Sequence, residues 1–183
     1  SGKQIPKICE LRERLHFGTA FQWEYRALYY GHELLHAVGY EPQREPDRII
    51  EEYCRRDYRY DTAYRHFICA YDQIEDTIEF EALKDRMENI YTTEYLEKIV
   101  YSWNEAYRRD GMRTGIMPQG NFYREKVEKV KEKVAVIISD ALRYEVAMQL
   151  FDRLEQDQNC TVSMDVMMGI VPSYTALGMA NLL

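Results

Sequence analysis

The sequence predicts a mainly α-helical protein in two parts: a helical bundle over residues 1–120 and, over residues 121–183, the incomplete start of an α/β domain. Apolar side chains recur every three or four positions through much of the first part, as they do along one face of a helix. Three glycines and a proline fall between residues 110 and 121 and mark a boundary. A short β-branched run then replaces the helical period.

The composition narrows the class of protein. The 183 residues are 46% hydrophobic and 30% charged, which is typical of a folded protein rather than a disordered one. No apolar run reaches the ~18 residues of a membrane span, and residues 1–7 do not resemble a secretory leader. Because the chain lacks an initiator methionine, we expect a segment of a longer protein, with Ser1 and Gly2 as a cloning remnant.

Charge and cysteine usage exclude further classes. The chain has 24 basic and 31 acidic residues, and its net charge of −7 argues against general binding to a nucleic-acid backbone. Its four cysteines are scattered without a CxxC pair, so neither a cysteine metal cluster nor a redox dithiol is indicated. Reduced cysteines and the lack of a leader predict a cytoplasmic protein with no membrane partner.

The first part is predicted to be helical from about residue 7 to residue 109. One apolar stripe at helical spacing contains Tyr64, Phe67, Ile68, Tyr71, Ile74 and Ile78. A second stripe contains Leu96, Ile99, Val100, Trp103 and Tyr107. Pro42 and Pro46 interrupt the helices before these stripes, and Asp47 is predicted to cap the helix that follows.

The second part has a strand–helix–strand pattern. Residues 134–139 suit a strand buried on both faces, a helical pattern begins at Leu142, and a second strand is predicted from about residue 161 to residue 170. This order is the βαβ unit of a parallel sheet. We expect a truncated domain, because roughly fifty residues leave too few helices to cover both faces of such a sheet.

His32, Glu33 and His36 match the HExxH pattern of zinc metallopeptidases. Histidines four residues apart share a helix face and can bind zinc, while the glutamate activates water. A catalytic zinc needs a third protein ligand, for which Glu51 or Glu52 is available. A zinc metallopeptidase is therefore one alternative function, and an ordinary amphipathic helix with half-exposed histidines is the other interpretation.

Two polar residues of the second part are candidates for catalysis. Asp140 follows the first predicted strand, at the edge where open α/β sheets bind their ligands. Thr175 follows the second strand, at the start of a possible helix whose backbone N–H groups favour a phosphate. For each residue the alternative is a simple helix-capping role.

These residues resemble a known family. Residues 138–145 (Ile-Ser-Asp-Ala-Leu-Arg-Tyr-Glu) and 172–179 (Pro-Ser-Tyr-Thr-Ala-Leu-Gly-Met) are similar to the opening of the PglZ domain. That family belongs to the alkaline phosphatase superfamily and is a component of bacterial bacteriophage-exclusion (BREX) phage-defence systems. Residues 61–65, 88–91 and 119–123 resemble the helical region that precedes the domain, and residues 1–60 are assigned by continuity.

The resemblance implies a metal-dependent phosphoesterase or phosphodiesterase with an alkaline-phosphatase-like fold. Asp140 would be the first metal ligand, and Thr175 would be a metal-coordinated nucleophile that forms a covalent phosphothreonine. The metal in this superfamily is most often zinc, with manganese or magnesium as alternatives. Arg143 is a candidate phosphate contact, and surface solubility is its alternative role.

The resemblance also implies that part of the site is missing. Members of the superfamily complete two metal sites with later Asp and His ligands, whereas this chain has no histidine after His66. Its last aspartates, Asp152, Asp157 and Asp165, match no ligand motif. We therefore expect this segment alone to hold no metal and to be inactive, within a parent protein that is a hydrolase.

The partners implied by the resemblance are other proteins of a phage-defence complex, together with a phosphorylated substrate or a nucleic acid. A third alternative function is a non-catalytic helical protein-interaction module of that complex. The net charge of −7 slightly favours a protein partner over direct DNA binding.

Overall fold

The computed structural model describes residues 4–111 and 113–183, and the chain divides into two compact units, Ser1–Met112 and Arg113–Leu183. Both units are built from helices, and no β-strand forms in these residues. The mainly helical composition predicted from the apolar spacing is thus confirmed. In the same ranges, no helix combines the length and the apolar character that crossing a bilayer requires.

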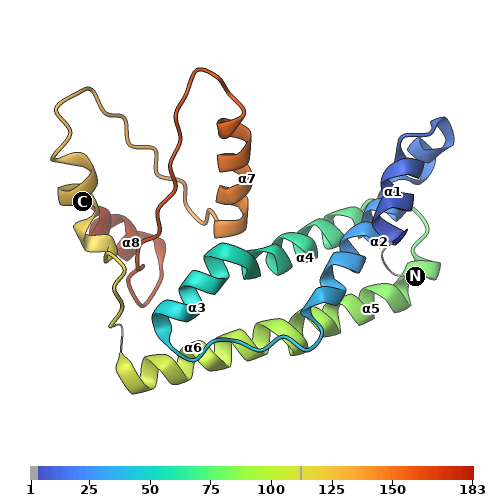
Figure 1. Ribbon diagram of the computed structural model, residues 1–183, viewed down its shortest axis with the longest axis horizontal. Helices are drawn as coiled ribbons and strands as arrows, with labels where there is room; N and C mark the ends of the chain where they lie inside the picture. Colours follow the sequence, from blue (N-terminus) through green and yellow to red (C-terminus); the bar gives the residue numbers. More distant parts are fainter. Residues whose placement is uncertain (1–3, 112) are drawn as a thin grey trace. The chain divides into compact units, whose positions relative to one another are not determined.

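The described residues of the first unit form six α-helices, which short helical segments and loops connect (Figure 1). The helices are α1 (Ile5–Glu13), α2 (Gln22–Leu34), α3 (Pro46–Glu52), α4 (Tyr58–Tyr71), α5 (Glu81–Asn89) and α6 (Glu97–Asp110). Two π-helical segments, η4 (Tyr53–Asp57) and η6 (Ile90–Leu96), continue α3 into α4 and α5 into α6. Such widened turns are rare and are often found at functional positions.

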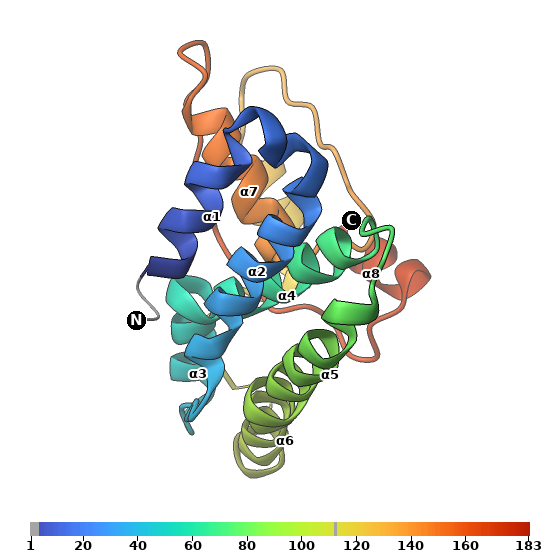
Figure 2. The same ribbon diagram turned by 90° about the vertical axis from the view of Figure 1, so that its right-hand side faces the viewer.

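Helices α2 and α4 pack against each other at the centre of the first unit, and α1 lies alongside α2 (Figure 2). The core between the helices is rich in aromatic side chains. Its buried members are Ala27, Leu34, Ala37, Tyr40, Ala63, Phe67, Ala70, Ile74, Met87, Ile90, Tyr91 and Tyr95. The stripe predicted over residues 64–78 is largely confirmed, because Phe67 and Ile74 are buried there, but Ile78 is 76% exposed.

The second predicted stripe is not a buried face. Leu96, Val100 and Tyr107 are exposed, while Ile99 packs against the core. Helix α6 buries Ala106, which lies two turns after Ile99 on the same face. A helix can carry several neighbouring apolar stripes, and the elements packed against it decide which of them is buried.

Helix α3 begins at Pro46, whose fixed φ suits the first helical position. The prediction that Asp47 caps this helix is wrong. Asp47 lies in the first turn, and the cap position is Glu45, which makes no side-chain capping hydrogen bond. The charge of Asp47 still favours the positive end of the helix dipole.

Two buried aspartates of the first unit accept hydrogen bonds from tyrosine hydroxyls. Tyr40 donates to Oδ2 of Asp57 at 2.6 Å. Tyr53 and Tyr91 donate to the two oxygens of Asp61 at 2.6 and 2.8 Å. A buried carboxylate without partners is costly, and these tyrosines supply partners to both acids, together with Arg56, whose Nε donates to Oδ1 of Asp57 at 2.8 Å.

The described residues of the second unit form α7 (Tyr144–Glu155), α8 (Thr175–Leu182) and the turns η7 (Gln119–Asn121) and η8 (Tyr123–Val127). The helix predicted from Leu142 is present as α7. The predicted strands at residues 134–139 and 161–170 are not formed, and the one bridge described joins Pro118 to Met168. A parallel strand needs neighbouring strands for its hydrogen bonds and helices over its faces. Here residues 134–139 have neither, and Ile137 is 92% exposed.

Candidate functional site

The structure brings Thr175 and Asp140 together. The Thr175 hydroxyl oxygen, Oγ1, lies 3.1 Å from Oδ2 and 3.3 Å from Oδ1 of Asp140, and it donates a hydrogen bond to this carboxylate. The two residues are 35 positions apart in the sequence, and both are exposed. Two motifs that were identified separately therefore meet at one point of the second unit.

Neither residue caps a helix, which was the alternative role for both. The cap of α7 is Arg143 rather than Asp140, and Thr175 is the first residue of α8 rather than its cap. Asp140 lies in a turn beside Ala141, whose φ of 55° is in the left-handed region. An alanine is strained there, and such strain is frequent at functional sites.

The start of α8 is suited to an anion. Tyr174, at the cap position, has extended backbone (φ −127°, ψ 152°), and the first turn of the helix contains no acidic side chain. The first N–H groups of a helix have no acceptor within it. Together with the helix dipole they attract a phosphate, and Thr175 stands among them.

Gln119 connects the segments around this pair. Its Nε2 donates to the carbonyl oxygen of Gly178 in α8 at 2.7 Å, and its Oε1 accepts from the N–H of Ile170 at 3.2 Å. One side chain thus joins the loop before Thr175 to the helix that begins with it. Sequence reasoning did not single out Gln119, and its only signal was its place in the segment 119–123.

Asp140 and Thr175 line a cavity of about 480 Å³. Apolar walls surround a few polar groups, which is the usual character of a small-molecule site. The lining residues are Gln119, Ile138, Ser139, Asp140, Ala141, Gly169, Ile170, Ser173, Tyr174, Thr175, Gly178, Met179 and Leu182.

Arg143, the predicted phosphate contact, is not among the residues that line this cavity. Its Nε lies 3.3 Å from Oε1 of Glu145 in the first turn of α7. The structure therefore places its guanidinium against a carboxylate of its own helix, and a phosphate-binding role for Arg143 stays a prediction.

His32, Glu33 and His36 also lie together, where α2 meets the short helix η3 (Leu35–Ala37). One potential ligand atom from each lies within 4.8 Å of the others. Glu51 and Glu52 form ion pairs with nearby arginines instead of joining them. A zinc peptidase needs a third ligand as well as a free glutamate. In the part of the chain that the structure describes, this cluster supplies only these three groups, so the geometry does not favour a peptidase.

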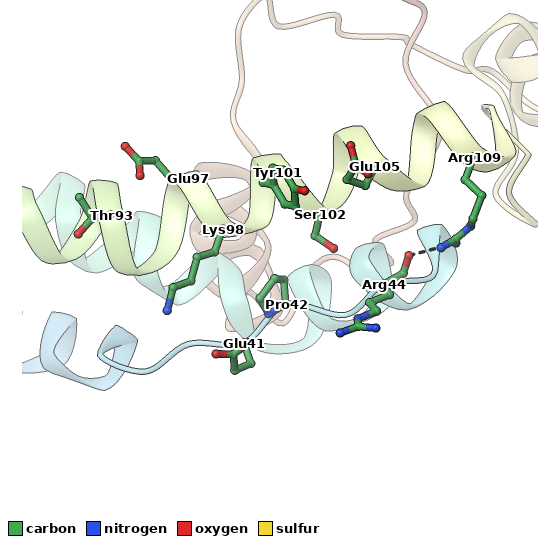
Figure 3. Close-up of a pocket in the computed structure, with 10 residues that line it drawn as sticks. All are labelled: Glu41, Pro42, Arg44, Thr93, Glu97, Lys98, Tyr101, Ser102, Glu105 and Arg109. Atoms are coloured by element: carbon green, nitrogen blue, oxygen red, sulfur yellow. Dashed lines mark hydrogen bonds between the residues drawn. The ribbon is translucent and has the colours of Figure 1, made fainter.

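A larger cavity, of about 710 Å³, is a groove between α6 and the loop 40–44 (Figure 3). Lys98, Ser102 and Arg109 point from α6 toward this loop and donate to its backbone carbonyl groups at 3.1, 2.5 and 3.3 Å. A hydrogen bond from Lys98 also holds the pKa of the Glu94 carboxyl below its usual range. These contacts attach the loop to the helix, and none of the predicted site residues lines the groove.

Comparisons with known proteins identify the second unit. Residues 122–183 match the family model of the BREX system PglZ alkaline phosphatase-like domain. The alkaline phosphatase-like protein PglZ of Bacillus cereus (strain H3081.97) is 39% identical over 189 residues, which cover 97% of this chain and 22% of the relative. The alkaline phosphatase-like protein BrxZ of Escherichia coli O9:H4 (strain HS) is 35% identical over 144 residues, covering 72% of this chain and 16% of the relative. No solved structure matches the chain.

The chain spans about a fifth of the length of these curated relatives. Both motifs on which the resemblance was based, residues 138–145 and 172–179, lie inside the segment that matches the family model. The relative from Bacillus cereus extends the similarity over nearly the whole chain, including the helical first unit. The chain therefore belongs to the PglZ family of alkaline phosphatase-like proteins of BREX systems.

Proposed function

We propose that Asp140 and Thr175 are the first metal ligand and the nucleophile of a site that hydrolyses phosphoesters. The observation that carries the proposal is the contact of the Thr175 hydroxyl with both carboxylate oxygens of Asp140 at the start of α8. A threonine hydroxyl is a weak nucleophile until it is activated. The carboxylate fixes the direction of the hydroxyl, and the helix end provides the place for the phosphate.

In the proposed reaction, Oγ1 of Thr175 attacks the phosphorus of a phosphoester held by the first N–H groups of α8. The new Oγ1–P bond forms while the bond from phosphorus to the leaving oxygen breaks. The threonine proton passes to solvent, and the leaving oxygen takes a proton from solvent. Water then hydrolyses this covalent intermediate, which restores the hydroxyl and releases phosphate from a monoester substrate or a phosphomonoester from a diester substrate.

The donor atoms of this pair fit a divalent cation. Asp140 offers carboxylate oxygens and Thr175 a hydroxyl oxygen 3.1 Å away, in an open cavity. Oxygen donors of this kind bind zinc, manganese or magnesium, and the superfamily favours zinc. When bound, such an ion makes the hydroxyl more acidic and neutralises charge on the phosphoryl oxygens.

The 183 residues alone are proposed to be inactive and to hold no metal at this site. One carboxylate and one hydroxyl are fewer protein ligands than a catalytic zinc has. Asp152, Asp157 and Asp165 do not line the cavity, and the sequence has no histidine after His66. The remaining ligands are proposed to come from the part of the family's longer members that this chain does not span.

The proposed substrate is a phosphate ester in a nucleic acid, a nucleotide or a phosphoprotein. Membership of a BREX family supports other proteins of the phage-defence complex as partners of the helical first unit, in the cytoplasm. The net charge of −7 supports protein contacts over general binding to a DNA backbone.

The test is phosphodiester hydrolysis by a longer protein that includes the rest of the relatives' length. Thr175→Ala is expected to lower the rate by about 10³-fold or more, and Thr175→Ser to retain part of it. Asp140→Asn is expected to lose both rate and bound metal. With a phosphodiester the covalent intermediate keeps the ester group that did not leave, so mass spectrometry of the quenched wild-type reaction is expected to find this esterified phosphoryl group on the peptide that contains Thr175.

Ser173→Ala is the matched control, since this hydroxyl lines the same cavity without contacting Asp140 in the hydrogen bonds described. A Thr175→Ala protein with the wild-type rate would exclude Thr175 as the nucleophile. If the longer protein hydrolyses no phosphoester and still captures its partners when both residues are replaced, the helical interaction module is the better description.

A further inference from the structure

The cluster at the end of α2 has no role in the proposed hydrolysis. We propose that His32, Glu33 and His36 together bind one divalent metal ion of the zinc type, in a site that lacks the free glutamate of a metallopeptidase. The three residues belong to the first unit, whereas Asp140 and Thr175 belong to the second. The proposal is therefore independent of the proposed function, and for the first unit it replaces the expectation that this segment alone holds no metal.

The spacing of the donor atoms supports one shared ion. His32 Nδ1 and Glu33 Oε1 are 3.6 Å apart, while two ligands of a tetrahedral zinc, each ~2.0–2.1 Å from the metal, are about 3.3–3.4 Å apart. His36 follows His32 by one helical turn, and their ring centroids are 5.7 Å apart. All three donors lie within 4.8 Å of one another, so small side-chain rotations would bring them to a single ion.

His32 supplies a second, independent observation. Its Nδ1 atom is buried and has no hydrogen-bond partner. The distance of 3.6 Å from this atom to Oε1 of Glu33 is too long for a hydrogen bond. Buried polar atoms are nearly always paired, and an exception calls for an explanation such as an ion. A cation between the imidazole and the carboxylate would satisfy both groups.

The number of ligands determines what the site can do. The ligands exclude the mechanism of the HExxH peptidases: if Glu33 coordinates the ion, no glutamate of the cluster remains to activate water, and if it does not, the two histidines are too few for a catalytic zinc. Among the described residues, no fourth group joins the cluster. The ion is therefore expected to stabilise the fold, since a ligand that binds only the folded state shifts the equilibrium toward it.

The position of the cluster indicates which part of the fold is stabilised. His32 and Glu33 are in the last turn of α2, and His36 is in η3. The backbone carbonyl of His36 also accepts a hydrogen bond from the hydroxyl of Tyr60, in α4, at 3.2 Å. A bound ion is expected to hold the α2–η3 junction in the conformation that makes this contact.

The experiment titrates the 183-residue chain, freed of metal with a chelator, with zinc chloride by calorimetry and with cobalt chloride by visible absorption. One ion per chain is expected, with a higher melting temperature at saturation. Loss of a group that merely supports a metal ligand weakens binding by about 10–100-fold. His32→Ala, Glu33→Gln and His36→Ala are therefore each expected to weaken it by at least about tenfold.

Two matched variants serve as controls. His66→Ala removes an imidazole that stacks on Tyr30, outside the cluster, and Asp152→Asn removes an exposed carboxylate of the second unit; both are expected to bind the ion as the wild type does. Circular dichroism checks that each variant is folded. If His32→Ala unfolds, Glu33→Gln gives the same comparison, because the Glu33 side chain is 42% exposed.

No bound ion, or equal affinity in the wild type and the folded cluster variants, would overturn the proposal. A charge-transfer band from thiolate to cobalt would also overturn it, because it would assign the ion to a cysteine. If Thr175→Ala abolishes hydrolysis but the chain binds no zinc at His32, only the metal site of the first unit is disproved. If the chain binds zinc at His32 but Thr175→Ala keeps the wild-type rate of hydrolysis, only the proposed function is disproved.

Discussion

The hydroxyl of Tyr40 lies 2.6 Å from Oδ2 of Asp57, and both side chains are buried. The bond joins the loop after η3 to the π-helical segment η4, so a residue between α2 and α3 holds the carboxylate that the widened turn directs inward. Asp57 accepts a second hydrogen bond from Nε of Arg56 at 2.8 Å. Removing one hydrogen-bond donor from a buried carboxylate lowers the free energy of unfolding of the protein.

Replacing Tyr40 by phenylalanine is therefore expected to lower the free energy of unfolding by about 1–3 kcal/mol, because Asp57 loses a donor in the core. Urea unfolding of the 183-residue chain measures the change. Tyr101→Phe is the control. Tyr101 is 67% exposed, so removing its hydroxyl is expected to change the free energy of unfolding by no more than about 0.5 kcal/mol. Equal effects of the two substitutions would contradict a stabilising role for the Tyr40–Asp57 bond.

Buried tyrosines predict a loss of stability in alkali. Burial raises the pKa of Tyr95 and of Tyr40 well above the usual range, and the hydrogen bond to Asp57 raises that of Tyr40 further. In the unfolded chain each hydroxyl titrates near its ordinary pKa of about 10. Above that pH the unfolded state binds fewer protons than the folded state, so the free energy of unfolding falls as pH rises.

The expected slope is about 1.4 kcal/mol per pH unit for each such tyrosine. Urea midpoints measured from about pH 8 to about pH 11 reveal it. Tyr95→Phe is expected to reduce the slope by one tyrosine's share, whereas Tyr101→Phe, at an exposed position, leaves it unchanged. A slope that Tyr95→Phe does not alter would show that Tyr95 is not the group responsible.

Gln119→Ala is expected to loosen the start of α8. The substitution removes the hydrogen bonds to Gly178 and Ile170 and leaves both backbone groups without this partner. Faster amide exchange in residues 170–178 is the expected result, with a local cost of about 1–3 kcal/mol. Gln158→Ala, at an exposed position, is the control. Unchanged exchange in Gln119→Ala would mean that other contacts position Thr175.

Replacing two glycines of the first unit by alanine is expected to change the stability of the chain in opposite directions. A Cβ at Gly31, in α2, would lie 3.4 Å from Sδ of Met87 and 3.5 Å from Cε2 of Phe67, which is ordinary contact. Gly31→Ala is therefore expected to stabilise the chain by about 0.5–1 kcal/mol through helix propensity. A Cβ at Gly18 would lie 1.8 Å from the carbonyl oxygen of Arg12, so Gly18→Ala is expected to destabilise it by about 1–3 kcal/mol. Melting temperatures with the same sign for both would contradict the packing described.

The sequence predicted helices well where one apolar stripe faces one partner. Residues 64–78 form such a stripe, and its central part is buried against α2. At the end of η6 and along α6 the apolar positions cover more than one face, and Ile99 and Ala106 pack inward while Leu96 and Val100 are exposed. The π-helical turns η4 and η6 were not predicted, because a widened turn adds a residue without a composition of its own.

The sequence pointed to the two residues of the candidate site but not to the side chain that holds the surrounding segments together. Asp140 and Thr175 stood out as chemical groups after two apolar runs, and the structure places them in contact. Gln119 acts through backbone groups of Gly178 and Ile170, which carry no sequence signal. The two predicted strands did not form for a related reason. A β-branched run favours a strand, but a strand forms only where neighbouring strands can pair with it.

The irregular segment around Ile137 has a consequence for handling the protein. Val134, Val136, Ile137 and Ile138 are exposed and pair with no strand in the part of the chain described, a combination that favours cross-β aggregation. The net charge of −7 repels other copies of the chain and opposes this association. Salt screens that repulsion, so turbidity is expected to grow with ionic strength and protein concentration.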